Sequence, residues 1–433
     1  MDKKYDNSQL ILKKLINSNE LSNEIIDELK NSYESGAFPN FLIRLVKNNL
    51  VSSDILDMLA HYKIDEVRES VALSKKTSPE TLLYLADDIS YSVCRKVANN
   101  ENTPIKALEL LSHSEDNDTR VSVAQNKKSN SDILDALYKK DEILPVRIAI
   151  ARHSNTSTKT LSLLTIDTNP MVRAYVACNF HTSLVDLERL FIENPSSDED
   201  LFILRSLAKN AKTPTHILEK IALSEYVDIR EYVAFNPSAS SSLLAKLGTD
   251  KDIMVRRAVA FNTSTPLSTL EVLSDDSASD VRNGVALNAK TPEHIIRKLA
   301  TDKSSWVLQG VANNINTPVD ILTRLANGTT QIKCCVASNT STPVTVLRSL
   351  ARYCKDIGVK ECLAYNKNTP DDILMSLAQE TIPIQLTVIN NPNASAETLN
   401  ILINSGDSYI SQEAKRIASE RRIISHKNSS VER

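Results

Sequence analysis

Hydrophobic residues recur along this chain in a pattern that repeats about every 26 residues. Valine–alanine steps such as Val259-Ala260 and Val285-Ala286 mark the repeat most clearly. Aliphatic residues also stand eleven and fourteen positions after each marker, and this spacing of three places them on one face of a helix. Alignment on the first residue of the step gives fourteen anchors: Leu45, Val71, Val97, Val123, Ile150, Val176, Leu207, Val233, Val259, Val285, Val311, Val336, Leu363 and Val388.

Polar positions between the apolar ones predict where the helices end and begin. Asn stands three residues after most anchors, as at Asn288, and Thr-Pro follows six and seven residues after them, as at Thr291-Pro292. Asn tolerates the left-handed backbone of a helix C-terminus and bonds its own turn, so it is expected to end a first helix. Thr is expected to cap a second helix, whose first position suits Pro.

Each repeat is therefore predicted to be two helices joined by turns. One such unit cannot bury its own apolar face, so neighbouring units must stack. We predict an all-α fold, an α-solenoid of about fourteen 26-residue two-helix repeats over residues 41–406. Residues 1–40 are expected to form an N-terminal helical cap, and residues 407–433 a C-terminal capping helix followed by a basic tail.

The repeat resembles a known family. Residues Val281–Asp302 match, nearly column for column, the pattern of the leucine-rich repeat variant, which belongs to the wider armadillo- and HEAT-like superfamily. The resemblance covers most of the chain and implies a superhelix in which one helix of each repeat is short. Some members of that family carry a cysteine-rich iron–sulfur segment ahead of the repeats. No cysteine precedes Cys94 here, so this cluster is not expected.

Composition narrows the possible functions. The 433 residues include 51 Lys and Arg against 54 Asp and Glu, a formal net charge of -3, so an overall nucleic-acid coat is not expected. Only 7 glycines occur, without a phosphate-binding glycine motif. The six cysteines are spread along the chain without a CxxC pair, which is typical of proteins in a reducing compartment. No apolar run reaches the roughly 18 residues of a membrane span. A cytoplasmic protein is therefore expected. We predict no catalytic residues, no metal and no cofactor.

A basic residue recurs three positions before the anchor, and an acidic residue recurs seventeen positions after it. Acid and base from successive units are expected to face one another five or six residues apart in sequence, as a structural ladder of exposed ion pairs. The alternative is a row of guanidiniums that binds phosphates. The ladder arginines are Arg68, Arg120, Arg147, Arg173, Arg230, Arg256 and Arg282, followed by Lys333 and Lys360.

The second helix changes character along the chain at positions twelve and thirteen after the anchor. Early units carry Glu109, Asp135 and Glu188 there, whereas later units are basic. If these helices line the inner curve, the later units present a basic lane that could contact an acidic protein segment or a nucleic-acid backbone. Otherwise these are ordinary solvated side chains. The lane consists of Lys220, Lys246, Arg297, Lys298, Arg324 and Arg348.

Apolar residues succeed one another two positions after the anchor, at Phe235, Phe261 and Leu287, with Tyr365 further on. An exposed row of this kind would anchor a partner, and a buried one would pack repeats together.

The cysteines are interpreted as buried small hydrophobes. The longest spacing between anchors includes the acidic insertion 193–200, which is either a solvated loop or part of a binding edge.

These patterns favour a non-catalytic scaffold that binds a protein partner along its surface, through the basic lane with Phe235 and Phe261 as anchors. The alternative is a HEAT-like nucleic-acid-binding protein, resembling solenoid DNA glycosylases, that uses the same basic residues. A third possibility is an architectural rod that assembles with itself.

Overall fold

The computed structural model describes residues 37–48 and 50–431, together with Lys13, Leu15, Ile25, Glu28 and Asn31. Side chains are described as far as Arg421. Within these residues all regular secondary structure is helical, and the helices succeed one another in fourteen pairs before a final long helix. The chain divides into two compact units, Met1–Ile217 and Leu218–Arg433. The N-terminal cap expected over residues 1–40 lies almost entirely outside the described residues.

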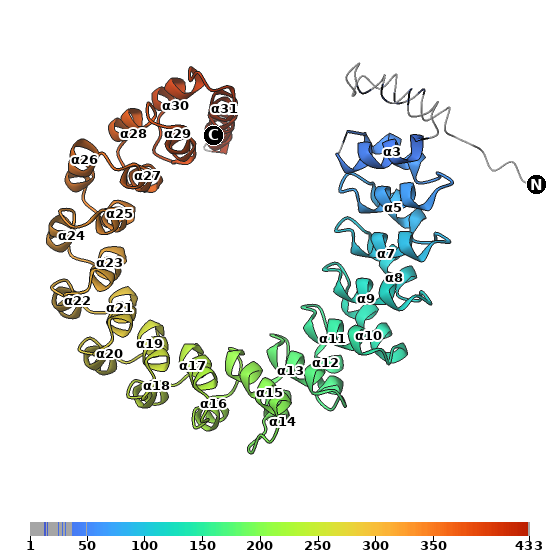
Figure 1. Ribbon diagram of the computed structural model, residues 1–433, viewed down its shortest axis with the longest axis horizontal. Helices are drawn as coiled ribbons and strands as arrows, with labels where there is room; N and C mark the ends of the chain where they lie inside the picture. Colours follow the sequence, from blue (N-terminus) through green and yellow to red (C-terminus); the bar gives the residue numbers. More distant parts are fainter. Residues whose placement is uncertain are drawn as a thin grey trace, which may run out of the picture. The chain divides into compact units, whose positions relative to one another are not determined.

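In the first unit the first helices of the repeats carry odd numbers and the second helices carry even numbers (Figure 1). Their bounds are α3 (Phe38–Lys47), α4 (Ser53–Leu59), α5 (Asp65–Leu73), α6 (Pro79–Leu85), α7 (Tyr91–Asn99), α8 (Ile105–Leu111), α9 (Asn117–Gln125), α10 (Ser131–Lys140), α11 (Leu144–Arg152), α12 (Thr158–Leu164), α13 (Pro170–Cys178), α14 (Leu184–Leu190) and α15 (Asp198–Lys209). Helix α16 (Thr215–Ile221) includes the division between the units.

The second unit continues the same alternation. Its helices are α17 (Val227–Phe235), α18 (Ser241–Leu247), α19 (Ile253–Phe261), α20 (Leu267–Leu273), α21 (Ser279–Leu287), α22 (Glu293–Leu299), α23 (Ser305–Asn313), α24 (Val319–Leu325), α25 (Thr330–Ser338), α26 (Val344–Tyr353), α27 (Ile357–Tyr365), α28 (Asp371–Leu377), α29 (Ile382–Asn390), α30 (Ala396–Ile403) and α31 (Ser408–Val431). The predicted all-α solenoid is therefore confirmed.

The core of each unit is built from the repeated apolar columns. All fourteen anchors are buried, and so are the second-helix leucines such as Leu270 and Leu273. Helices of seven to nine residues are too short to be stable alone in water, so packing between neighbouring repeats must supply their stability. First helices pack directly against the next first helix, as α19 does against α21 and α21 against α23.

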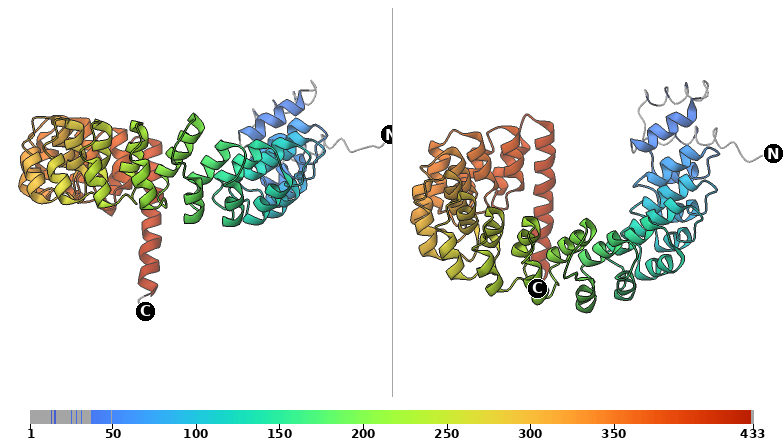
Figure 2. Two further views of the ribbon diagram at one scale, coloured as in Figure 1. Left: turned by 90° about the horizontal axis from the view of Figure 1, so that it is seen from below. Right: turned by 60° about the horizontal axis from the view of Figure 1, so that its bottom comes forward.

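Small residues before the anchor bring the first helices close together. A Cβ added to Gly284 would lie 2.8 Å from the Cβ of Ala260 on the preceding first helix. In the second unit the first helices accordingly line the inner side of the curve, and the second helices line its outer side (Figures 1 and 2). We call these two surfaces the first-helix face and the second-helix face in both units.

The asparagine after most first helices ends the helix and bonds its own turn as predicted, but without the left-handed backbone and with an additional role. Asn288 has φ -68° and ψ 122°, which is extended rather than left-handed backbone. Its Nδ2 donates to the carbonyls of Ala260 (2.8 Å) and Asn262 (3.0 Å) in the preceding repeat, while its Oδ1 accepts from the Lys290 amide. The prediction of a left-handed helix end is therefore wrong. The asparagines form a buried ladder that joins successive repeats.

The Thr-Pro pair also acts one residue out of the predicted register. In the α21–α22 repeat, Pro292 is the N-cap, with φ -72° and ψ 159°, and it provides no side-chain cap. The hydroxyl of Thr291 instead donates to the carbonyl of the anchor Val285 at 2.6 Å. The threonine thus closes the first helix rather than starting the second. Side-chain N-caps occur where Ser or Asn replaces Pro, as at Ser240.

Helix α31 is much longer than the repeat helices, at 24 residues, and its C-terminal part extends beyond the stack of the second unit (Figure 2). It packs against α29 and α30. The guanidinium of Arg421 donates to the carbonyls of Ile389 (3.2 Å), Asn391 (2.9 Å) and Ala394 (2.6 Å). Ile389 and Asn391 occupy the two columns that a following asparagine would contact. Arg421 therefore ends the asparagine ladder.

Candidate functional site

The ladder arginines lie at the edge where each second helix leads into the next first helix. Their carboxylate partners come from about 20 residues later in the chain, and not from the acid five or six residues earlier. That earlier residue is contacted through its backbone carbonyl: Arg282 donates to Asp276 O at 2.7 Å and to both carboxylate oxygens of Asp302, at 2.6 and 3.0 Å. The pairs are Arg68–Asp88, Arg120–Asp141, Arg147–Asp167, Arg230–Asp250, Arg256–Asp276, Arg282–Asp302 and Lys360–Glu380.

These pairs are largely shielded from water. The side chains of Arg282 and Asp302 are 19% and 9% exposed. Hydrogen bonds from Arg282 lower the pKa of Asp302 against the opposing effect of burial. Arg173 follows the same backbone pattern and donates to the carbonyls of Asp167 and Thr168. Because these guanidiniums bond the loops of the protein itself, their donors point away from an external phosphate.

The basic lane lies on the second-helix face, on α16, α18, α22, α24 and α26. The sequence hypothesis placed these residues on the inner curve, whereas in the second unit the inner side is formed by the first helices (Figure 1). All six residues of the lane are exposed. The lane therefore exists as a surface row, on the opposite side from the expected one.

Acidic neighbours neutralise much of this lane. Arg297 contacts Asp320 at 2.7 Å and Glu293 at 2.8 Å, and Lys298 contacts Asp275 at 2.5 Å. Arg348 likewise pairs with Asp372 at 2.7 Å, and Arg324 donates to the carbonyl of Ala300. The pairs join consecutive second helices, as Arg297 on α22 reaches Asp320 on α24. Exposed pairs of this kind each contribute at most about 1 kcal/mol.

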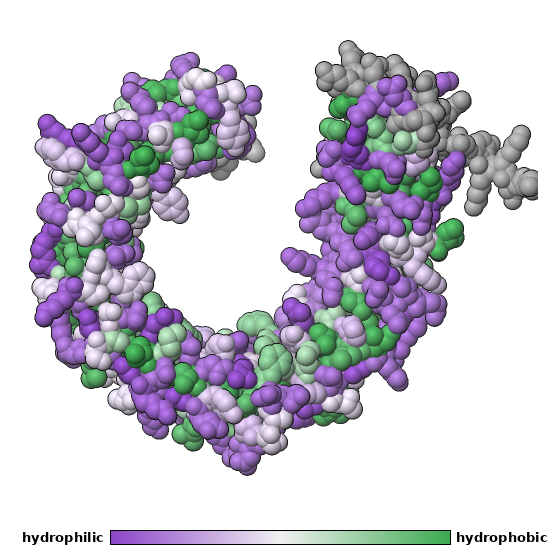
Figure 3. Space-filling view, viewed as in Figure 1, coloured by the Kyte–Doolittle hydropathy of each residue, from purple (hydrophilic) through white to green (hydrophobic). Residues whose placement is uncertain are grey.

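The predicted aromatic anchors lie on the first-helix face, so the structure does not bring them together with the lane. Phe235 on α17 is 43% exposed, and Phe261 on α19 is half-buried. Other large apolar side chains share this face of the second unit: Met254, Trp306 and Tyr365 are 40%, 52% and 73% exposed. Figure 3 shows hydrophobic residues of the second unit in separate patches among hydrophilic ones.

A shallow hollow lies on the same face between α27 and α29. Its volume is about 350 Å³, and its lining includes Tyr365, Leu386, Thr387 and Asn390. Tyr365 and Asn390 stand two residues after the anchors Leu363 and Val388, and Leu386 and Thr387 stand just before Val388. The apolar core does not use these positions. The hollow thus adds an indented, partly apolar element to the exposed side chains of the first-helix face.

A second cluster, in the first unit, was missed by sequence reasoning. The guanidinium of Arg152 lies 5.1 Å from the ring centre of Tyr175, whose ring meets Phe202 edge to face at 6.1 Å. The ammonium of Lys212 lies 4.2 Å from the ring centre of Phe180. These five residues come from α11, α13, α15 and the turns that follow α13 and α15. We call them the basic–aromatic cluster.

A signal for this cluster was present in the sequence. Between Leu144 and Val185 the only acidic residue is Asp167, and its carboxylate is paired with Arg147. A comparison of the charges on the first helices and the turns that follow them, instead of on the second helices, would have shown that this stretch lacks acidic residues. The aromatic residues occupy three different columns, so a search along single columns could not detect them.

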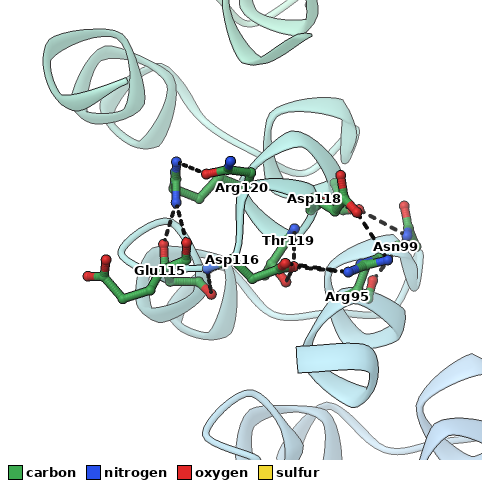
Figure 4. A network of polar contacts seen from close by, with 10 residues as sticks. Arg95, Asn99, Glu115, Asp116, Asp118, Thr119 and Arg120 are labelled. Atoms are coloured by element: carbon green, nitrogen blue, oxygen red, sulfur yellow. Dashed lines mark hydrogen bonds and ion pairs between the residues drawn. The ribbon is translucent and has the colours of Figure 1, made fainter. Parts of the chain in front are cut away.

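Arg95 is a first-helix cation that has carboxylate partners, although its buried Nε has no hydrogen-bond partner. It lies on α7 and reaches Asp116 at 3.3 Å and Asp118 at 3.2 Å at the start of α9 (Figure 4). In the same region Arg120 donates to the carbonyls of Ser114 and Glu115. Arg95 therefore has carboxylate partners within the protein.

The cysteines are less uniformly buried than predicted. Cys94 is buried, and burial raises the pKa of its thiol to about 11. Cys178 is exposed, and Cys334, Cys335, Cys354 and Cys362 are half-buried, so the interpretation as buried small hydrophobes is wrong for these five. Among the described residues, no group of three or more His, Cys, Asp or Glu side chains is arranged to hold a metal ion.

The acidic insertion 193–200 forms a loop and the first turn of α15. Ser197 is the N-cap of this helix, and Asp200 accepts hydrogen bonds from the amide and hydroxyl of Ser196. The bond from the Ser196 amide lowers the pKa of Asp200. Helix α15 has 12 residues, so the insertion is partly used to lengthen this first helix. In the part of the chain that the structure describes, no helix combines the length and apolarity needed to cross a membrane.

Comparison with known proteins gives similarity to solved structures. No family model matches the chain, and no curated protein matches it. A leucine-rich repeat variant with a novel repetitive structural motif is 23% identical, with a TM-score of 0.36, and the match covers 52% of this chain and 86% of that one. Yeast importin-β (Kap95p) is 12% identical, with a TM-score of 0.33, over 99% of this chain and 67% of that one.

Importin-β in an ammonium sulfate condition is also similar, at 11% identity and a TM-score of 0.31 over 95% of this chain and 72% of that one. Because these TM-scores are low, the fold assignment rests on the helices and their packing. The helices and their sequential packing make the chain an α-solenoid of two-helix repeats.

Proposed function

We propose that this protein is a non-catalytic repeat scaffold that binds a protein partner along its first-helix face. The observation that carries the proposal is the row of exposed apolar side chains on that face of the second unit: Phe235, Met254, Trp306 and Tyr365. These residues lie on α17, α19, α23 and α27, and exposed aromatic residues are typical anchors of protein interfaces. The hollow beside Tyr365 offers a place for an apolar side chain of the partner.

The geometry favours this face over the predicted basic lane. Arg297 and Lys298 already form ion pairs with Asp320 and Asp275. A partner at the lane would have to replace those contacts before it gained any affinity. Apolar side chains on the first-helix face have no such competing partner, and their burial is favourable by about 25 cal/mol per Å².

The same ion pairs argue against a nucleic-acid function for the lane. Binding to a nucleic-acid backbone depends on cations that are available to neutralise phosphates. The ladder arginines bond internal loops, and Arg297, Lys298 and Arg348 bond carboxylates. We therefore favour a protein partner for the second unit.

Site-specific photo-cross-linking tests the proposal. A photoreactive phenylalanine analogue would replace Trp306 on the first-helix face or, as a control, Val272 on the second-helix face. The two positions are similarly exposed, at 52% and 63%. We expect one protein partner, identified by mass spectrometry, to be captured from position 306 and not from position 272. Capture from position 272 alone, or from neither position, would contradict the proposal.

A further inference from the structure

The basic–aromatic cluster of the first unit carries charge that the fold does not balance. Arg152 is exposed and contacts the ring of Tyr175, and no carboxylate lies within ion-pair distance of it among the described residues. Lys212 is likewise exposed and lies over the ring of Phe180. Arg95, two repeats before Arg152 on the same face, is held by two aspartates. The cluster therefore differs from Arg95 in charge compensation, and its two cations are also more exposed than the half-buried Arg95.

The aromatic rings hold the cations in place rather than offering a free stacking surface. A guanidinium over a ring keeps its N–H donors directed outward in a fixed plane, which suits bidentate binding of a carboxylate. Tyr175 is covered by Arg152 on one side and meets Phe202 on another. Phe180 is covered by Lys212 and meets His181 edge to face. Unpaired bases would need these ring faces, whereas carboxylates need only the donors.

We propose that the basic–aromatic cluster, on α11, α13, α15 and their following turns, binds an acidic segment of a protein partner. Arg152 and Lys212 bind carboxylates of that segment, and the exposed parts of Phe180 and Phe202, 63% and 38% exposed, contact its apolar side chains. The inference rests on the proposed scaffold function and names the chemistry of a partner. Charge complementarity supports it around α11 and α13, because Asp167 is the only acid from Leu144 to Val185 and is already paired; the acids near Phe202 are confined to the first turn of α15.

Fluorescence anisotropy with a defined probe tests the inference on the full chain. The probe is a labelled 12-residue peptide of four Glu-Glu-Leu repeats, long enough to cross three first helices spaced about 10 Å apart. A peptide of four Lys-Lys-Leu repeats and a 12-nucleotide single-stranded DNA serve as comparison probes. We expect the acidic peptide to bind more tightly than either, and its affinity to fall as salt is raised.

Matched charge reversals locate the site. The variant Arg152→Glu with Lys212→Glu should weaken binding of the acidic peptide about tenfold or more, because two attractive contacts become repulsive. The control Lys106→Glu with Lys159→Glu makes the same change of net charge on the second-helix face of the same unit and should change Kd less than about twofold. The milder pair Arg152→Gln and Lys212→Gln gives an intermediate loss and guards against misfolding, which circular dichroism monitors.

Two results would overturn the inference: equal losses in the site and control variants, or binding of the single-stranded DNA at least as tight as that of the acidic peptide. Failure here is distinguishable from failure of the scaffold function. Cross-linking from position 306 lies in the second unit and does not involve Arg152 or Lys212. A partner captured there, with no effect of the charge reversals, would refute only the acidic-segment site.

Discussion

Replacement of one buried ladder asparagine should destabilise the stack far more than its side-chain size suggests. Asn288 is 2% exposed and makes three hydrogen bonds: Nδ2 to Ala260 O at 2.8 Å, Nδ2 to Asn262 O at 3.0 Å, and Oδ1 from the Lys290 amide at 2.9 Å. In Asn288→Ala the Ala260 carbonyl loses this donor, whereas the Asn262 carbonyl keeps the bond from the Thr265 amide at 3.1 Å. A buried group left without its partner costs about 1–3 kcal/mol, so we expect a loss of about 1–3 kcal/mol.

Asn316 provides a matched control of the same residue type. Its Nδ2 also donates to a carbonyl of the preceding repeat, Ala289 O at 2.7 Å, but the residue is exposed. Water can replace this bond, so Asn316→Ala should cost no more than about 0.5 kcal/mol. Unfolding in urea, followed by circular dichroism, measures both losses. Hydrogen exchange of α19 and α21 would show whether the loss is confined to the adjoining repeats, as nearest-neighbour coupling requires.

Two further substitutions separate hydrogen bonding from volume. Asn288→Asp keeps the shape but points a carboxylate at two carbonyl oxygens, so it should be worse than alanine. Asn288→His should retain more stability than alanine, because the chain already uses His153 in this column, with Nε2 2.9 Å from Asn126 O and Nδ1 accepting from the Asn155 amide. If Asn288→Ala is no more destabilising than Asn316→Ala, the buried ladder does not hold the repeats together.

Three other outcomes are expected. Gly284→Ala should lower the free energy of unfolding in urea by about 1–3 kcal/mol, because the added Cβ would lie 2.8 Å from the Cβ of Ala260. In the control Gly406→Ala the added Cβ would have no atom within 4 Å, so the free energy of unfolding should change by less than about 0.5 kcal/mol. The pKa of Asp302 is lowered in the folded protein, so its carboxylate stabilises the fold above the unfolded pKa of about 3.9. As the pH falls from about 5 to 2, the free energy of unfolding should therefore decrease more for the wild type than for Asp302→Asn. Parallel pH profiles of the two proteins would contradict this. Cys94, whose pKa burial raises to about 11, should be alkylated by iodoacetamide at pH 8 much more slowly than exposed Cys178, and equal rates in peptide mass spectrometry would show otherwise.

The repeat fold was predictable because its apolar columns recur in every unit. Burial of an anchor such as Val285 and of the leucines on the second helix follows from spacing alone, since fourteen copies make a chance pattern improbable. The close approach of first helices was also visible in the small residues before the anchor, such as Gly284. That column could have been used to place the first helices on the inner side, because the more closely packed row of a curved stack is the inner one.

The roles of individual polar residues were harder to predict, because one residue type satisfies several backbone groups. Thr291 could cap the second helix or close the first, and the choice depends on Pro292, whose extended backbone makes it the N-cap itself. The threonine hydroxyl, one residue further back, then reaches the carbonyl of Val285. For Asn288 the sequence showed a turn residue, but its contacts with Ala260 connect residues 28 apart and depend on how the repeats stack.

Charge could not be assigned to a surface from sequence columns alone. Arg297 and Asp320 are 23 residues apart, so their pairing was visible only once α22 and α24 were placed side by side. The same limitation hid the contrast between Arg95, which has two carboxylate partners, and Arg152, which has a ring instead. Column positions predict where a side chain lies, but not whether a neighbouring repeat neutralises it.

This division between repeated and variable positions bears on where recognition is encoded. In a solenoid, stability is close to a sum of repeat and nearest-neighbour terms, so positions outside the repeated columns can change without unfolding the stack. On the first-helix face such positions carry Arg95, Arg152, Phe235 and Trp306 in different repeats. Their chemistry passes from balanced charge to unbalanced charge within the first unit and is apolar in the second. Within each unit, recognition would therefore depend on the order of such side chains along the chain, which no single repeat contains.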